Sequence, residues 1–153
     1  MTWASGYFDR VKKKFKKEFK EEYFLSDPDF FYKKHYTDNK EMVFADIRLS
    51  KKNFVQSPIY YEGYKKLGIQ KLLPGNGTIK LKQKDSLEIS LDTHRIITSV
   101  YFKFDHRKGY FKPTMSIENH NYIFRYRFDK PIKDAVTIYI NGEGIITYNV
   151  IVK

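Results

Sequence analysis

Apolar residues near the start of the chain recur at every fourth position, and lysines fill many of the positions between them. On a helix of 3.6 residues per turn, a step of four keeps these side chains on one slowly drifting stripe. The pattern therefore predicts an amphipathic helix over about residues 3–25. Its stripe, which we expect to dock on a partner, consists of Trp3, Tyr7, Val11, Phe15, Phe19 and Tyr23.

Signals for further helices follow this stretch. Asp27 suits a helix N-cap and Pro28 suits the first helical position, which predicts a short helix over about residues 28–36. Gly68 is placed to end another turn or two of helix, because glycine readily adopts the left-handed conformation of a C-terminal cap. Gly63 counts against that element, since glycine weakens a helix interior.

From residue 78 onward the hydrophobic period changes from four to two. Alternation of apolar and polar residues indicates strands with one face on a core. The connectors between these runs are short and polar, and none could hold the crossover helix that joins parallel neighbours. Together with one earlier run, the predicted strands are 42–49, 78–83, 86–92, 95–104, 110–117, 121–129, 135–141 and 145–152.

Short strands at a spacing of roughly 8 to 12 residues favour an antiparallel β-sandwich of immunoglobulin-like or jelly-roll type. An OB-like barrel is the alternative. We therefore expect a mainly β protein with N-terminal helices: a helical arm over residues 1–40 and a β-sandwich domain over residues 41–153. A length of 153 residues suits one core with such an appended arm.

The residue types exclude several kinds of chemistry. The chain has no cysteine, so it forms no disulfide, thiolate metal site or cysteine nucleophile. Its lysine-rich start has no following apolar segment, and no stretch of eighteen apolar residues occurs. We therefore expect a cytoplasmic or virion protein that is neither secreted by a standard signal nor transmembrane.

The formal net charge of +11 favours acidic partners, nucleic acid among them. Frequent Lys, Ile, Tyr and Asn also indicate an AT-rich coding genome, which lowers the weight of that argument. Arginines beside aromatic strands could form a stacking platform for single strands. The candidate contacts to nucleic acid or other anions are Lys12, Lys13, Lys16, Lys17, Lys20, Lys103, Arg125 and Arg127.

One metal site is conceivable at a sheet edge. If strands 95–104 and 110–117 form a hairpin, its register brings two histidines and two carboxylates to one end, a donor set that suits zinc. These residues are His94, His120, Asp92 and Glu118. The simpler interpretation is that polar turn residues gather where loops gather. No catalytic signature occurs elsewhere, so neither an enzyme nor a cofactor is expected.

The main hypothesis is a non-enzymatic structural or adaptor subunit of a larger homo- or hetero-oligomeric assembly, docked on protein partners through its N-terminal helix. In general character, a small basic sandwich with a terminal arm resembles the neck, tail or capsid-accessory proteins of bacteriophage particles. The alternatives are a nucleic-acid-binding protein and, third, a metal-dependent enzyme at the histidine edge. A membrane surface is a weaker candidate partner for the basic helix.

Overall fold

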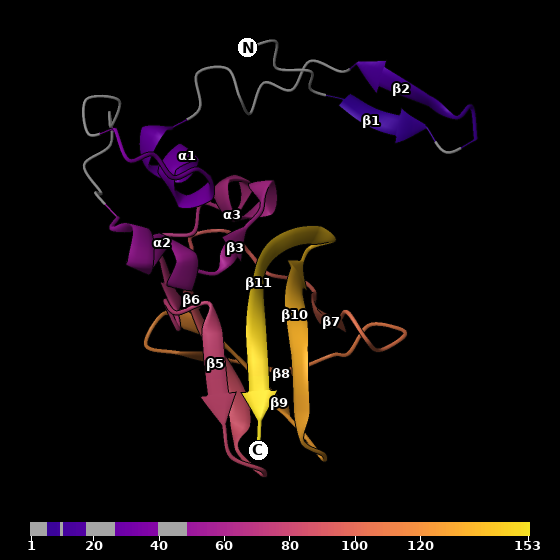
Figure 1. Ribbon diagram of the computed structural model, residues 1–153. Helices are drawn as coiled ribbons and strands as arrows, with labels where there is room; N and C mark the ends of the chain where they lie inside the picture. The colour runs from indigo at the N-terminus through magenta and orange to yellow at the C-terminus, as the bar shows by residue number, and fades with distance from the viewer. Residues whose placement is uncertain (1–5, 10, 18–26, 40–48) are drawn as a thin grey trace.

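The computed structural model describes residues 6–9, 11–17, 27–39 and 49–153 (Figure 1). Its helices are α1 (Pro28–Lys34), α2 (Lys51–Gln56) and α3 (Glu62–Lys66). Its strands are β1 (Gly6–Asp9), β2 (Lys14–Lys17), β3 (Ile59–Tyr60), β4 (Lys71–Leu73), β5 (Thr78–Leu81), β6 (Ser86–Asp92), β7 (Val100–Phe104), β8 (Thr114–Glu118), β9 (Asn121–Arg127), β10 (Ile132–Ile140) and β11 (Glu143–Val152).

The prediction of one long N-terminal helix is wrong for the described residues, because β1 and β2 form an antiparallel hairpin there. The Asp9 carboxylate accepts hydrogen bonds from the backbone N–H groups of Val11 and Lys12, each at 3.0 Å, and so holds the turn. Lys13 completes it with a positive φ of 48°. A helix would instead stack like-charged lysines at spacings of three and four, which is destabilising.

The short helix predicted after Asp27 is confirmed as α1. The Asp27 carboxylate accepts a hydrogen bond from the Phe30 backbone N–H at 3.1 Å, as an N-cap should. Phe30 is buried and stacks on Tyr64 of α3 with 6.2 Å between ring centroids. Lys34 adds an ion pair to Glu62 at 3.1 Å. These contacts attach α1 to α3 and the body of the protein.

Helix α3 ends at the predicted glycine. Gly68 has a φ of +60° and donates its N–H to the Lys65 carbonyl, while Ile69 donates to Tyr64, the bonding pattern of a Schellman cap. Gly63, which counted against a helix, has a different role. A Cβ there would collide with the Gly144 carbonyl, so its absence lets α3 lie directly on β11.

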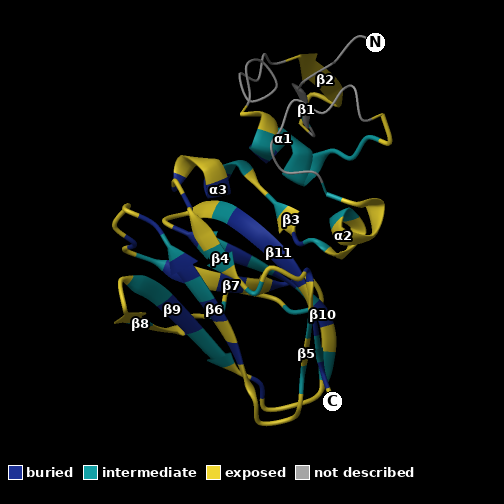
Figure 2. Ribbon diagram, turned by 90° about the vertical axis from the view of Figure 1, so that its left-hand side faces the viewer, coloured by how far each residue is buried: buried dark blue, intermediate teal, exposed yellow. Residues whose placement is uncertain are grey.

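Two sheets form the body of the molecule. One has the order β3-β11-β10-β7 with β5 also paired to β11, and the other has the order β4-β6-β9-β8. Neighbouring strands are antiparallel except β5, which runs parallel to β11. In Figure 2 the buried residues, in dark blue, lie on strands of both sheets. The core between them includes Phe102, Phe104, Phe124 and Tyr148, each at 0% exposure.

This arrangement confirms the predicted sandwich. The order β4-β6-β9-β8 corresponds to strands A-B-E-D of an immunoglobulin-like domain, and β7-β10-β11 corresponds to C-F-G. Two separate sheets rule out the OB-like barrel that was the alternative. The strand predicted at 42–49 lies, apart from its last residue, outside the described residues, as does the boundary at residues 40–41 between the predicted arm and the sandwich domain.

The hairpin predicted from strands 95–104 and 110–117 forms only as one bridge near its turn, and the prediction is wrong for the rest of the two strands. β7 and β8 belong to different sheets, and a single bridge from Phe102 to Phe111 is all that continues β7 on that side. Pro113 follows two residues later and has no N–H with which to extend a ladder. The chain therefore crosses there from one sheet to the other.

Candidate partner-binding face

An exposed group of tyrosines lies on the outer face of the sheet that contains β7, β10 and β11. Tyr101 on β7 is paired with Tyr139 on β10. Tyr110, from the loop after β7, contacts both rings nearly at right angles, with centroid distances of 6.3 Å and 5.5 Å. Edge-to-face packing of this kind holds each ring in place. The three side chains therefore form one continuous aromatic cluster.

Lys103 and Tyr61 extend this surface on either side. The Lys103 Nζ lies 5.8 Å from the Tyr110 ring centroid, within range of a cation–π contact. Across the sheet, a Cβ on Gly144 would lie within 4 Å of both the Tyr139 and Tyr61 rings, so these two rings flank the glycine. Below, we call Tyr61, Tyr101, Tyr110, Tyr139 and Lys103 the tyrosine face.

The face is accessible and has unused hydrogen-bonding groups. Tyr110 is 59% exposed and Tyr101 is 39% exposed. The Tyr61 hydroxyl is bonded to the Thr147 hydroxyl at 3.0 Å. Within the described chain, the hydroxyls of Tyr101, Tyr110 and Tyr139 have no hydrogen-bond partner, so they are free to bond a ligand. Rings with a free polar end suit a protein interface.

The outward-facing charges on strands β5, β7 and β10 of this sheet are positive. The alternating burial of β5, β7 and β10 turns Lys80, Lys103 and Lys133 outward and no carboxylate. Asp134 of β10 is buried on the inner side. Glu143, at the start of β11, is already paired with Lys66 at 3.0 Å. On these strands, lysine is therefore the charged residue that faces solvent.

Arg125, a predicted nucleic-acid contact, is instead held by its own sheet. On the outer face of the β4-β6-β9-β8 sheet its Nε donates to Glu88 at 2.7 Å and its Nη1 to Glu118 at 2.8 Å. The bond from Arg125 lowers the pKa of Glu118. The positive charge of Arg125 is therefore balanced by the carboxylates of Glu88 and Glu118. Arg127 lies on the same sheet, opposite the one that bears Lys103, so the three predicted contacts form no common surface.

The residues predicted to dock through an N-terminal helix have a different setting. The hairpin register pairs Tyr7 with Lys16 and places Lys17 opposite Gly6. Tyr7 therefore shares no helical stripe with Val11 and Phe15, the next residues of the four-residue pattern. Val11 is 93% exposed at the turn, beside Lys12 and Lys13, and Phe15 is 50% exposed on β2. The remaining predicted residues lie outside the described part of the chain: Trp3, Phe19, Lys20 and Tyr23.

The candidate metal ligands do not assemble. His94, His120, Asp92 and Glu118 are all described, and no group of three or more metal-binding side chains occurs among the described residues. The β6–β9 register does bring the end of β6 near the turn after β8. Glu118, however, is engaged by Arg125, and the hairpin on which the geometry depended is not formed.

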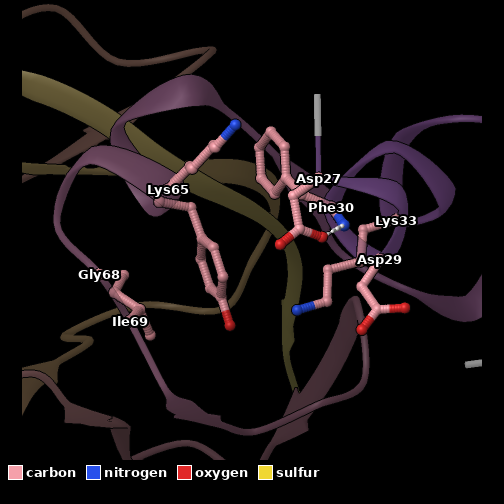
Figure 3. A pocket seen from close by; sticks show the side chains of 8 residues that line it. Asp27, Asp29, Phe30, Lys33, Lys65, Gly68 and Ile69 are labelled. Atoms are coloured by element: carbon pink, nitrogen blue, oxygen red, sulfur yellow. Dashed lines mark hydrogen bonds between the residues drawn. The ribbon is translucent and has the colours of Figure 1, made fainter. Parts of the chain in front are cut away.

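Two shallow hollows lie near α3. The first, about 190 Å³, lies between α1 and α3 and is shown in Figure 3. Asp27 and Asp29 line it together with Lys33 and Lys65, so its charges balance. The second, about 300 Å³, lies between α3, the loop after β6 and the β10–β11 turn. Neither brings together the groups of a catalytic site.

No family model and no curated protein sequence matches the chain. Among solved structures, a mutant of the titin I27 domain aligns with 56% of this chain and 86% of its own, at 11% identity and a TM-score of 0.38. Domains 4 and 5 of the S-layer protein SbsC align with 55% of this chain and 51% of theirs, at 12% identity and a TM-score of 0.34. None of the described helices is long and apolar enough to cross a membrane.

Proposed function

We propose that this protein is a non-enzymatic structural or adaptor subunit of a larger assembly, such as a virion, and that it holds an acidic protein partner on the tyrosine face. The observation that carries the proposal is the mutually packed, exposed cluster of Tyr101, Tyr110 and Tyr139 on strands that turn lysines and no carboxylate outward. Tyrosine supplies large contact area at little entropic cost, which is why it is enriched in protein interfaces.

The same face has one property that favours protein over single-stranded nucleic acid. Binding of single strands requires ring faces on which bases stack. Here Tyr110 stands edge-on to both of its tyrosine neighbours, and Lys103 lies over the Tyr110 ring. Arg125, the cation expected to complete a stacking platform, is paired with two glutamates on the other sheet. The edges and hydroxyls that remain suit side chains and backbone carbonyls.

Affinity recovery from source cells tests the proposal. The bait is the full chain, compared with a Tyr101→Ser/Tyr110→Ser double variant, and each extract is tested both with and without nuclease treatment. We expect one acidic protein at stoichiometric amount with the wild type, and a loss of at least about 30-fold with the double variant, equivalent to one interface hot spot. Raising the salt concentration should slow the association, because the lysines steer it.

A matched control removes an exposed apolar side chain from the opposite sheet. Leu73→Ser changes a residue on β4 that is 47% exposed, and it should leave recovery unchanged. Circular dichroism confirms that each variant is folded. Equal recovery by the double variant would overturn the proposal, as would a partner that disappears on nuclease treatment, since nucleic acid would then be the ligand.

A further inference from the structure

Most sheet edges of the sandwich are protected against pairing with another chain. Phe111 covers the middle of β7 through two backbone hydrogen bonds to Phe102, each at 2.8 Å. β4 has only three residues, begins with Lys71 and is followed by Pro74. β5 presents Lys80. Short strands, lysine and proline are the usual devices that block edge-to-edge association.

β8 has fewer of these devices, although Pro113 directly precedes it. It has five residues, Thr-Met-Ser-Ile-Glu, with neither lysine nor proline among them. It pairs with β9 on one side and ends the β4-β6-β9-β8 sheet on the other, where no described strand adds to it. Figure 2 shows it at the margin of the sandwich. Its outer backbone groups are therefore a template for another strand.

Two apolar side chains at this edge are exposed although they belong to the inner face. Met115 is paired with Phe124, and Ile117 with Tyr122, and both of these β9 residues pack in or against the core. Met115 nevertheless remains 48% exposed and Ile117 65% exposed. A strand added beside β8 would cover both. A strand that pairs with the free edge of β8 should therefore have apolar side chains on the inner face and polar side chains on the outer face.

The sequence of β8 itself meets that requirement. In an antiparallel pair centred on Ser116, Met115 lies opposite Ile117 of the second strand, and Thr114 lies opposite Glu118. Apolar residues then meet apolar residues on the inner face, and no two like charges are opposed. A shift of one residue would place Met115 opposite Ser116 and mix the two faces. The register centred on Ser116 is the one that keeps the two faces separate and pairs all five residues of each strand.

We propose that β8 pairs with β8 of a second copy of this chain, about a two-fold axis through Ser116, and joins the two sheets into one. Such an interface is isologous and closes at the dimer. It lies on the sheet opposite the tyrosine face, and the inference does not depend on the proposed function. One short strand from each copy gives less contact than the standard interface of about 1,600 Å². We therefore expect a dimer whose population depends on concentration.

Introduced cysteines test the register. The chain has no cysteine, so a single Ser116→Cys substitution places one thiol beside its symmetry mate. Directly opposed antiparallel residues have Cβ atoms about 4.5–5.5 Å apart, close to disulfide distance. Mild oxidation should link this variant into a dimer on a non-reducing gel. Thr114→Cys is the control, because Thr114 faces Glu118 and not its own copy. Equal cross-linking of the two variants, or none in Ser116→Cys, would overturn the proposal.

Sedimentation equilibrium of uncross-linked protein supplies a second readout. Ile117→Lys should weaken self-association at least tenfold, because it places two lysines at the join. Leu73→Lys adds the same charge at the other edge of the same sheet, where the native residue is 47% exposed, and should leave the dimer unchanged. A wild-type protein that stays monomeric over the whole concentration range contradicts the inference, as does an equal effect of the two lysines.

Discussion

His106 and Asp134 form an uneven ion pair at the end of β7. The Asp134 side chain is 4% exposed and that of His106 is 82% exposed, with 2.8 Å between Oδ1 and Nδ1. The hydrogen bond to Asp134 raises the pKa of His106, and the negative charges of Asp134 and Asp105 act in the same direction. The histidine therefore binds its proton more tightly in the folded protein than in the unfolded chain.

The sign of the pH dependence follows from this shift. A group whose pKa is raised by folding contributes stability that is complete below its unfolded pKa, near 6.5 for histidine, and that is lost as the pH rises through the folded value. We expect thermal stability to fall as the pH rises above about 6.5, and to fall less in His106→Asn. Melting curves at a series of pH values measure the difference. Parallel curves for the two proteins would show that the pair has no effect on stability.

The ion-pair partners of Arg125 could not be predicted from its local sequence. Its place beside aromatic residues on a strand suggested a free cation. Its partners, Glu88 and Glu118, come from the strands on either side of β9, and the first is separated from it by 37 positions. Cross-strand pairing of this kind depends on the register of three strands. The tyrosine face was missed for a similar reason, although Tyr101 and Tyr139 occupy the polar side of predicted strands.

At the scale of elements, α3 is positioned by close approach of backbone to backbone. Gly63 faces the Gly144 carbonyl and the Ile145 side chain, and the Tyr61 N–H donates to the Ile145 carbonyl at 3.0 Å. Helix and strand could not lie this close with any larger side chain at position 63. The geometry of the α3 and β11 contact thus depends on one missing methyl group.

Gly63→Ala should destabilise the protein by about 1–3 kcal/mol, the usual cost of overpacking a well-packed site. Gly75→Ala is the matched control. No atom lies within 4 Å of a Cβ built at Gly75 and its φ is not positive, so alanine there should be neutral or slightly stabilising. Urea unfolding followed by circular dichroism compares the two. An equally stable Gly63→Ala would show that α3 can move away from β11 at no cost.

The N-terminal hairpin shows where periodicity misleads. A step of four places side chains on one helical stripe, but four is also a multiple of two, so the same spacing keeps residues on one face of a strand. Turn chemistry decides between the two readings. Asp9 caps the backbone of Val11 and Lys12, a local bond that competes with helix formation. The predictions of α1 and of the Gly68 cap succeeded because both depended on capping residues.

For the molecule as a whole, the sandwich was predictable because apolar and polar positions alternate most clearly along β6 and β10. The interior is filled largely by the aromatic and branched residues that this alternation turns inward. Which strands pair was not predictable in the same way. The parallel neighbour of β11 and the crossing from β7 to β8 depend on contacts between distant segments. Local pattern does not encode such contacts.

Stability should be concentrated in this interior. Phe124 has 0% exposure and lies on a central strand, so Phe124→Ala should cost about 3–5 kcal/mol, a large share of the roughly 5–15 kcal/mol that holds a domain folded. Phe30→Ala should cost less, because α1 packs through one face at the margin of the core. Equilibrium denaturation of both variants makes the comparison. Equal losses would indicate that α1 is as integral to the core as β9.

The edge partners of β11 have a consequence for folding kinetics. The Tyr148 hydroxyl donates to Pro74 across 74 positions, and the Tyr61 and Thr147 hydroxyls meet across 86. Segments so far apart must find each other through slow closure of long loops, which places sandwiches of this kind in the millisecond-to-second range. Until β3 and β5 pair with β11, one edge of the β10–β11 hairpin is unpaired and can associate with other chains. The yield of refolding should therefore fall as the protein concentration rises.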